Sequence, residues 1–179
     1  MKLKTTVGYY FRDNRRAIAI YYAVILALYI LAGVEYRIAE AKSLNITIGG
    51  FDFATTIFVF VLGLNAFRSP FGVFMQNGVS RKTCFTGFFI LAGMTAVGMS
   101  AVDAVLAAAA RLFMPYRPLI EQLYGDYGVL IALKGFVWMT AVNLFSVSLG
   151  YLITVLYYKM EKPVKILVSA GLPVLLLIV

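Results

Sequence analysis

The sequence of 179 residues contains no histidine and a single cysteine, Cys84. Without histidine, the chain can form neither a Ser-His catalytic pair nor a zinc site built on histidine. One cysteine cannot form an internal disulfide. The sequence also lacks the glycine-rich loop ending in Lys-Ser or Lys-Thr with which many ATPases hold phosphate. We therefore expect no catalytic residue, no metal site and no cofactor on this chain, and no ATP hydrolysis by it.

Charged residues are scarce, at 13% of the chain against about 25% in a typical soluble domain. Hydrophobic residues make up 62%, and they form blocks rather than the alternating pattern of a membrane β-barrel. About 20 apolar residues cross the ~30 Å hydrocarbon core of a bilayer as a helix, which satisfies its own backbone hydrogen bonds. We predict spans at about 17–34, 51–67, 84–110 and 129–158, with a fifth run at 166–179.

The predicted fold class is an all-α membrane protein, a polytopic transmembrane helix bundle with at least four full helices in a domain over residues 17–179. The fifth run has only about 14 residues, too few to span at 1.5 Å per residue. No polar or charged residue follows it. We therefore expect the chain to be truncated after Val179.

Basic residues predict the orientation. Lys and Arg number 5, 2, 3, 2 and 3 in the N-terminal segment and the four successive loops, and the formal net charge is +8. Because loops rich in Lys and Arg stay in the cytoplasm, we expect a cytoplasmic N-terminus in a multi-pass plasma-membrane protein. The lipid bilayer is the partner that this charge pattern indicates, and we expect no nucleic acid.

The N-terminal segment, residues 1–16, carries apolar side chains at helical spacing, among them Leu3, Val7 and Tyr10. Basic residues fall largely elsewhere around that helix. The pattern predicts a short amphipathic helix in the cytoplasmic membrane interface, before the first span. The alternative is a disordered basic tail that only fixes the topology.

The segment 68–83, between the second and third spans, is more than a turn. Ser69 followed by Pro70 indicates a helix start, Gly78 suits a left-handed helix stop, and Ser80 can cap the next helix. A short helix at about 70–77 is predicted, with Phe71, Phe74 and Met75 on one face and Gln76 and Asn77 facing water or a partner. Its apolar face would either enter a cleft on a soluble protein or rest on the membrane interface.

The run Asn77-Gly78-Val79-Ser80-Arg81-Lys82-Thr83-Cys84-Phe85, with Gly87 beyond, resembles the corresponding stretch of bacterial ABC-2 type transporter permeases. In that family the loop between the second and third membrane helices forms a coupling helix that docks on the ATPase subunit, and an amphipathic interface helix precedes the first span. Such permeases usually have six membrane helices, more than this chain contains.

The resemblance implies separate ATP-binding cassette subunits, which bind ATP and Mg²⁺, and a second permease subunit in a homo- or heterodimer. It implies that the ATPase-docking residues are Ser69, Pro70, Phe71, Phe74, Met75, Gln76, Asn77, Gly78, Ser80, Arg81 and Lys82. The function it favours is the membrane-spanning permease subunit of an ATP-driven transporter, an exporter. The alternative class is a non-transporting membrane scaffold or regulatory subunit.

Two rows of residues inside the spans indicate either helix packing or a substrate path. In the third span, small residues recur every four positions, which allows another helix to approach closely; they are Ala92, Ala96, Ser100 and Ala104. In the fourth span, Thr140, Asn143 and Gly150 fall close to one face. The sequence leaves both interpretations open.

Asp103 is the single acidic residue well inside an apolar run, which makes it a functional candidate. It lies about 28 Å along the helix from Cys84. We therefore place it near the outer surface, as a headgroup-level carboxylate paired with Arg111; the alternative is a proton relay. An aspartyl intramembrane protease would need two buried acids, and the sequence indicates only Asp103.

Overall fold

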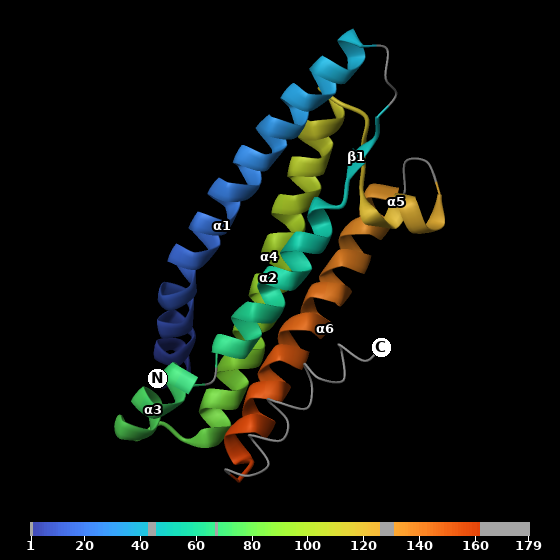
Figure 1. Cartoon of the computed structure of the whole chain (residues 1–179). Helices are drawn as coiled ribbons and strands as arrows, with labels where there is room; N and C mark the ends of the chain where they lie inside the picture. Colours follow the sequence, from blue (N-terminus) through green and yellow to red (C-terminus); the bar gives the residue numbers. More distant parts are fainter. Residues whose placement is uncertain (1, 43–45, 67, 126–130, 162–179) are drawn as a thin grey trace.

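The computed structural model describes residues 2–42, 46–66, 68–125 and 131–161, and it is mostly helical (Figure 1). The elements in chain order are α1 (Lys2–Ala41), β1 (Ile48–Gly49), α2 (Phe51–Asn65), α3 (Arg68–Gln76), α4 (Arg81–Arg111), β2 (Tyr116–Arg117), α5 (Leu119–Tyr124) and α6 (Ile131–Lys159).

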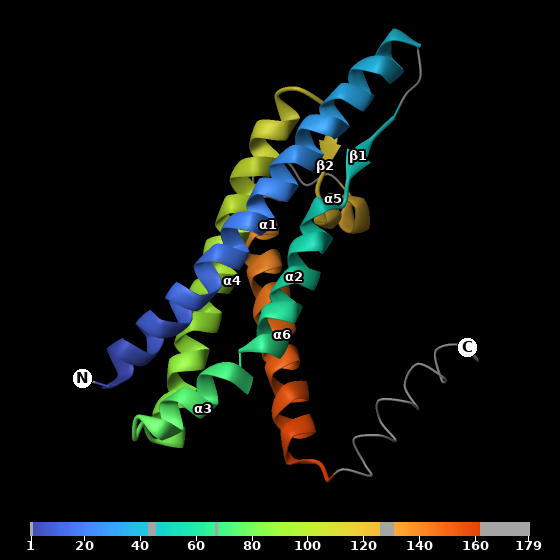
Figure 2. The same cartoon turned by 60° about the vertical axis from the view of Figure 1, so that its left-hand side comes forward.

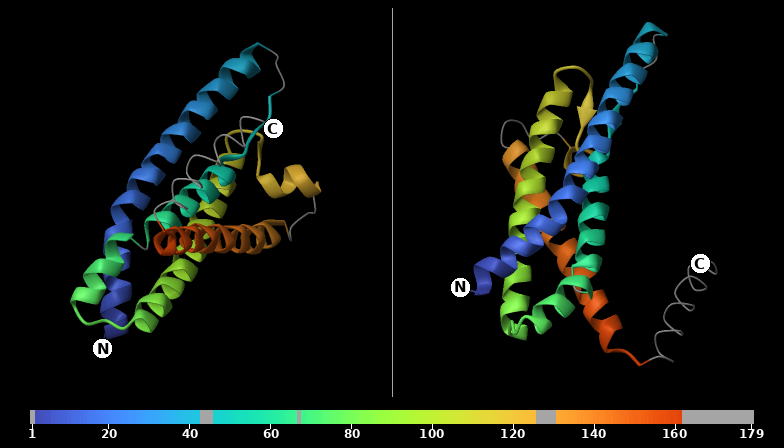
Figure 3. Two further views of the ribbon diagram at one scale, coloured as in Figure 1. Left: turned by 60° about the horizontal axis from the view of Figure 1, so that its bottom comes forward. Right: turned by 90° about the vertical axis from the view of Figure 1, so that its left-hand side faces the viewer.

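The four longer helices form one bundle. α4 packs against both α1 and α6, and α2 packs mainly against α6 (Figure 2). The short helix α3 lies across one end of the bundle, which we call the α3 end (Figure 3). The strands β1 and β2 pair in parallel, with Ile48 opposite Tyr116, at the other end, which we call the β end. The bundle therefore has two structurally different ends, a helical one at α3 and one with a short β-ladder.

Glycines allow α2 and α6 to cross with their backbones in contact. A Cβ on Gly63 would lie 2.3 Å from the Val147 carbonyl oxygen, and one on Gly150 would lie 2.4 Å from the Phe60 carbonyl oxygen. No side chain fits at either position, since real Cβ atoms do not approach so closely. Gly150 therefore packs against α2, which is one of the two roles that the sequence left open.

Three helices within the described ranges are long and apolar enough to cross a membrane: Leu3–Ala41, Arg81–Arg111 and Leu133–Lys159. Large apolar side chains on them face outward; Ile20, Ile30 and Phe145 are all more than 60% exposed. Unpartnered apolar faces on long helices are the pattern of a membrane-embedded protein, where lipid covers them.

The helix α2 lies within the predicted span 51–67 but is shorter than a full span. It has 15 residues, or about 22 Å of helix, against ~30 Å of hydrocarbon. The predicted fifth run, 166–179, lies outside the described residues.

The N-terminal segment is different from the prediction. We expected a separate interface helix over residues 1–16, but α1 is one continuous helix of 40 residues. Its first turns pack on α4: Thr6 is 1% exposed, and a Cβ on Gly87 would lie 2.9 Å from the Thr6 side chain. The basic residues that suggested an interface helix, among them Arg12 and Arg15, lie exposed on this same helix. Helical spacing alone could not show where the helix ends.

Candidate functional site

Local signals at the α3 end are as predicted. Gly78 has a φ of 65°, and the amides of Gly78 and Val79 donate to the carbonyl oxygens of Met75 and Phe74, which closes the end of α3. The Ser80 side chain accepts from the Thr83 amide at 3.2 Å and caps α4. The four-residue connection 77–80 therefore holds α3 against the start of α4.

The apolar face of α3 is occupied by the chain itself. The Phe74 ring, 5% exposed, meets Tyr9 and Tyr10 of α1 edge to face, with ring centroids 5.3 and 5.2 Å apart. Phe71 and Met75 are partly buried against the same core. Phe74 therefore packs inside the molecule and has little apolar surface left for a cleft on a partner, whereas Phe71 and Met75 keep part of theirs.

The exposed residues at this end lie on the outer side of α3 and the first turn of α4. They are Val73, Gln76, Asn77, Gly78, Ser80, Arg81 and Lys82. Ser69 and Pro70 belong to the first turn of α3, which begins at Arg68, slightly before the predicted start; their side chains lie outside the described part of the chain. A polar and basic surface is thus what this end can present to a partner.

The row of small residues on α4 divides into two parts. Ala92, Ala96 and Ser100 are at most 1% exposed, and they lie where α4 packs on its neighbours. Ala104 is exposed and lines a pocket. The packing interpretation is therefore correct for the first three residues, whereas Ala104 faces open space.

Asn143, fully buried on α6, joins three helices. Its amide donates to the Ser100 hydroxyl of α4 at 3.0 Å, and its oxygen accepts from the Thr56 hydroxyl of α2 at 3.2 Å. Thr140 instead donates to the Phe136 carbonyl oxygen of its own helix. Satisfied side-chain hydrogen bonds of this kind hold membrane helices together, so Asn143 has a packing role here.

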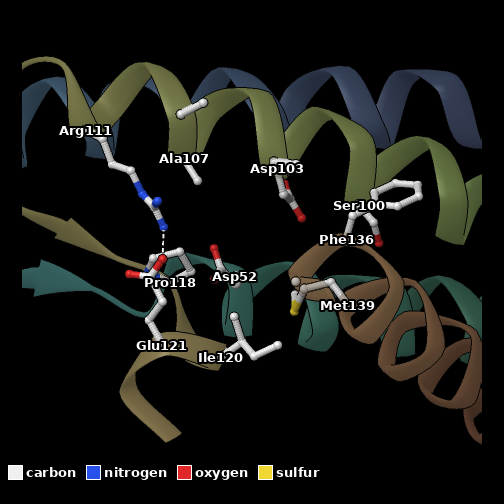
Figure 4. A pocket seen from close by; sticks show the side chains of 13 residues that line it. Asp52, Ser100, Asp103, Ala107, Arg111, Pro118, Ile120, Glu121, Phe136 and Met139 are labelled. Atoms are coloured by element: carbon white, nitrogen blue, oxygen red, sulfur yellow. Dashed lines mark hydrogen bonds and ion pairs between the residues drawn. The ribbon is translucent and has the colours of Figure 1, made fainter. Parts of the chain in front are cut away.

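The β end contains a pocket of about 220 Å³ between α4, α6, α5 and the start of α2. Most of its wall is apolar, with Ala107, Ile120, Phe136 and Met139. Four ionisable residues also line it: Asp52, Asp103, Arg111 and Glu121. Figure 4 shows Asp103 on α4 and Asp52 on α2 approaching the pocket from opposite sides. This pocket is the strongest candidate for a binding site in the described chain.

Asp103 is only 7% exposed. Its Oδ1 atom accepts from the Tyr22 hydroxyl of α1 at 3.2 Å, and the same hydroxyl lies 3.1 Å from the Met99 carbonyl oxygen. The predicted partner, Arg111, forms an ion pair with Glu121 of α5 instead. The pairing of Asp103 with Arg111 was therefore wrong, because α5 brings a second acid to Arg111 that helical spacing on α4 cannot reveal.

A second buried acid, Asp52, lines the same pocket as Asp103. Asp52, 5% exposed, accepts from the Tyr116 hydroxyl at 2.8 Å and from the Leu119 amide at 3.0 Å. Burial, followed by the charge of Asp52, raises the pKa of the Tyr116 hydroxyl, which remains a hydrogen-bond donor. Asp52 thus fastens α2 to the segment that carries β2 and α5. The expectation that Asp103 is the sole buried acid was wrong.

Sequence reasoning missed Asp52, Tyr22, Tyr116 and Thr56. Asp52 was not singled out from the sequence, although its place at the start of an apolar run was a usable signal. The tyrosines and Thr56 gave none, since their roles depend on contacts between residues far apart in the chain. Among the described residues, no group of three or more Asp, Glu, Cys or His side chains is arranged to hold a metal ion.

Comparison with known proteins gives no family assignment: no protein-family model, curated protein or solved structure matches the chain.

Proposed function

We propose that this chain is the membrane-spanning subunit of an ATP-driven exporter in the plasma membrane, with a cytoplasmic N-terminus, and that the α3 end docks on a separate ATP-binding subunit. One observation carries the proposal: α3 is attached to two long helices at once. Phe74 lies between Tyr9 and Tyr10 of α1, and the turn through Gly78 and Ser80 leads directly into α4. A force on α3 is therefore passed to both helices.

The buried and exposed faces of α3 suit different tasks. The buried rings fix α3 to the bundle, and the exposed Gln76, Asn77, Arg81 and Lys82 offer hydrogen bonds and positive charge to an acidic rim on a soluble partner. In this mechanism ATP and Mg²⁺ bind to the partner, whose closure pulls on α3. α1 and α4 then move relative to α6 and open the substrate path to the other side. A second permease subunit, identical or different, completes that path.

Charge reversal tests the docking. The chain is purified from its native host with whatever ATP-binding protein accompanies it, and ATPase activity is measured for wild type, Arg81→Glu and the control Arg117→Glu. Both arginines are exposed, but Arg117 lies in β2 at the opposite end. We expect Arg81→Glu to release the ATP-binding protein or to abolish stimulated ATPase activity, and Arg117→Glu to preserve both. Absence of an ATP-binding protein, or equal behaviour of the variants, would favour a scaffold or regulatory subunit.

Orientation is tested separately by thiol labelling. In a Cys84→Ala background, single cysteines are introduced at Gln76 near the α3 end and at Leu123 in α5, both exposed. A membrane-impermeant maleimide should label position 123 in intact cells and position 76 only after permeabilisation. The reverse pattern would place the basic surface outside the cell and contradict the docking proposal.

A further inference from the structure

The pocket at the β end contains an acceptor that the protein leaves without a partner. Asp103 Oδ2 is shielded from bulk solvent and makes no hydrogen bond within the described part of the chain. The nearby Thr55 hydroxyl interacts with the Asp103 carboxyl group, and it also shares a hydrogen bond of 2.6 Å with the Tyr21 hydroxyl. Burying a polar acceptor in this way is unfavourable unless something in the site satisfies it.

The charges around the pocket do not balance. Arg111 is paired with Glu121, which leaves the carboxyl groups of Asp52 and Asp103 without a cationic partner among the pocket-lining residues. Asp52 has two donors, the Tyr116 hydroxyl and the Leu119 amide. Asp103 accepts from the Tyr22 hydroxyl on Oδ1 and has the Thr55 hydroxyl nearby. Asp103 therefore has no cationic partner among the pocket-lining residues, and its Oδ2 atom has no hydrogen-bond donor within the described part of the chain.

The walls indicate what kind of cation fits. Ala107, Ile120, Phe136 and Met139 are apolar, and a hydrated metal ion would gain nothing from them. Metal ions also require several oxygen ligands, which these two carboxylates, one of them already accepting two hydrogen bonds, do not supply. At about 220 Å³ the pocket is smaller than the ~300–1,000 Å³ sites of drug-sized ligands. A small molecule with one ammonium group and an apolar body matches this combination.

We propose that the pocket binds a small apolar organic monocation, a primary amine whose ammonium group pairs with the Asp103 carboxyl group while its apolar part packs on Phe136 and Met139. Asp52 faces the same space from α2 (Figure 4) and adds negative potential without a direct contact being required. The site needs no ATP-binding subunit, so this inference stands independently of the proposed function.

Binding is measured by isothermal titration on the purified full chain in nanodiscs, with 3-phenylpropylamine as the probe. The matched neutral probe is 3-phenylpropanol, and Na⁺ and Mg²⁺ are titrated alone. Asp103→Asn keeps the shape of the side chain and removes its charge. The control variant Glu35→Gln removes one charge from an exposed position on α1. Ala104→Phe fills the pocket from an exposed lining position and tests the location without altering a carboxylate.

We expect the amine to bind wild type and Glu35→Gln within about twofold of each other, and to bind Asp103→Asn at least about tenfold more weakly, since a charge-assisted hydrogen bond is lost. Ala104→Phe should also abolish binding, with thermal unfolding showing that each variant folds. The proposal is overturned if wild type does not bind the amine, if the alcohol binds equally well, if Asp103→Asn binds like wild type, or if a metal ion alone binds in the amine's place. None of these outcomes bears on whether α3 docks on an ATP-binding subunit.

Discussion

At the α3 end, stacked and edge-to-face aromatic rings form the core, and basic side chains cover the surface; at the β end, tyrosine hydroxyls hold buried acids around an open pocket. Tyr9 and Tyr10 each meet the Phe74 ring edge to face, and these contacts hold α3 against α1. Tyr22 and Tyr116 instead direct hydroxyls at Asp103 and Asp52. The same residue type therefore builds a rigid joint at one end and an electrostatic site at the other.

The largest expected effect comes from Phe74→Ala, which removes the ring between Tyr9 and Tyr10. Deleting a buried aromatic side chain destabilises a protein by about 3 kcal/mol or more, and here the loss falls on the joint between α3 and α1. Hydrogen exchange of residues 68–80 should accelerate strongly. Val73→Ala, at an exposed position of the same helix, is the control. Equal exchange in both variants would mean that the aromatic contact does not hold α3.

Gly150→Ala tests the contact that joins the two ends, the crossing of α2 and α6. The added Cβ would lie 2.4 Å from the Phe60 carbonyl oxygen, so the backbones must separate, at about 2 kcal/mol. Denaturant unfolding measures the change. Gly98→Ala, where a Cβ meets nothing within 4 Å, should be neutral or stabilising by about 0.5–1 kcal/mol. If Gly150→Ala were equally harmless, the close crossing would be incorrect.

Tyr116→Phe acts on the β end alone. Loss of the hydrogen bond to Asp52 should destabilise the protein by about 1.5 kcal/mol at neutral pH. Because folding raises the pKa of Tyr116, its contribution is complete below the ordinary tyrosine pKa of about 10 and is lost as the pH rises above it. The alkaline loss of stability should therefore be shallower in Tyr116→Phe than in wild type.

The control for that comparison is Tyr124→Phe, since Tyr124 is exposed on α5. Unfolding curves at about pH 8 and pH 10.5 should show Tyr124→Phe following wild type. If Tyr116→Phe followed wild type as well, Tyr116 would not be the residue that fastens Asp52.

The smallest effect is expected for Asn143→Leu, midway between the ends. It removes the hydrogen bonds to Ser100 and Thr56, and such bonds between membrane helices are worth about 0.6 kcal/mol on average. A double-mutant cycle with Ser100→Ala measures the coupling: the second substitution should have little effect once Asn143 is gone. Strictly additive effects would exclude the hydrogen bond as a source of stability.

Sequence patterns correctly predicted several features that depend on residues close together in the chain, namely the positions and ends of some helices. Hydropathy placed the two long helices α4 and α6 to within a few residues, and the preferences of Gly78 and Ser80 marked the end of α3 and the start of α4. Those signals are local, since a positive φ favours glycine and a free amide favours a serine cap whatever the fold.

Contacts between residues far apart in the chain could not be predicted from the sequence. Phe74 was placed on the correct face of α3, but only the fold shows that α1 covers that face. Arg111 could pair with Asp103 or with an acid on another element, and in the fold it pairs with Glu121 of α5. Asp52 was missed because a short helix and a two-residue strand place it under Tyr116, 64 positions later.

The unbroken course of α1 has a mechanical consequence. A helix of 40 residues is a rod about 60 Å long, and it holds Tyr9 and Tyr10 near one tip, Tyr22 near the middle and Tyr29 beyond, where that ring meets Tyr116. With no proline in this stretch, the rod has no hinge of that kind at which motion could be absorbed. A tilt imposed through α3 is therefore expected to reach the tyrosines that contact Asp103 and Tyr116.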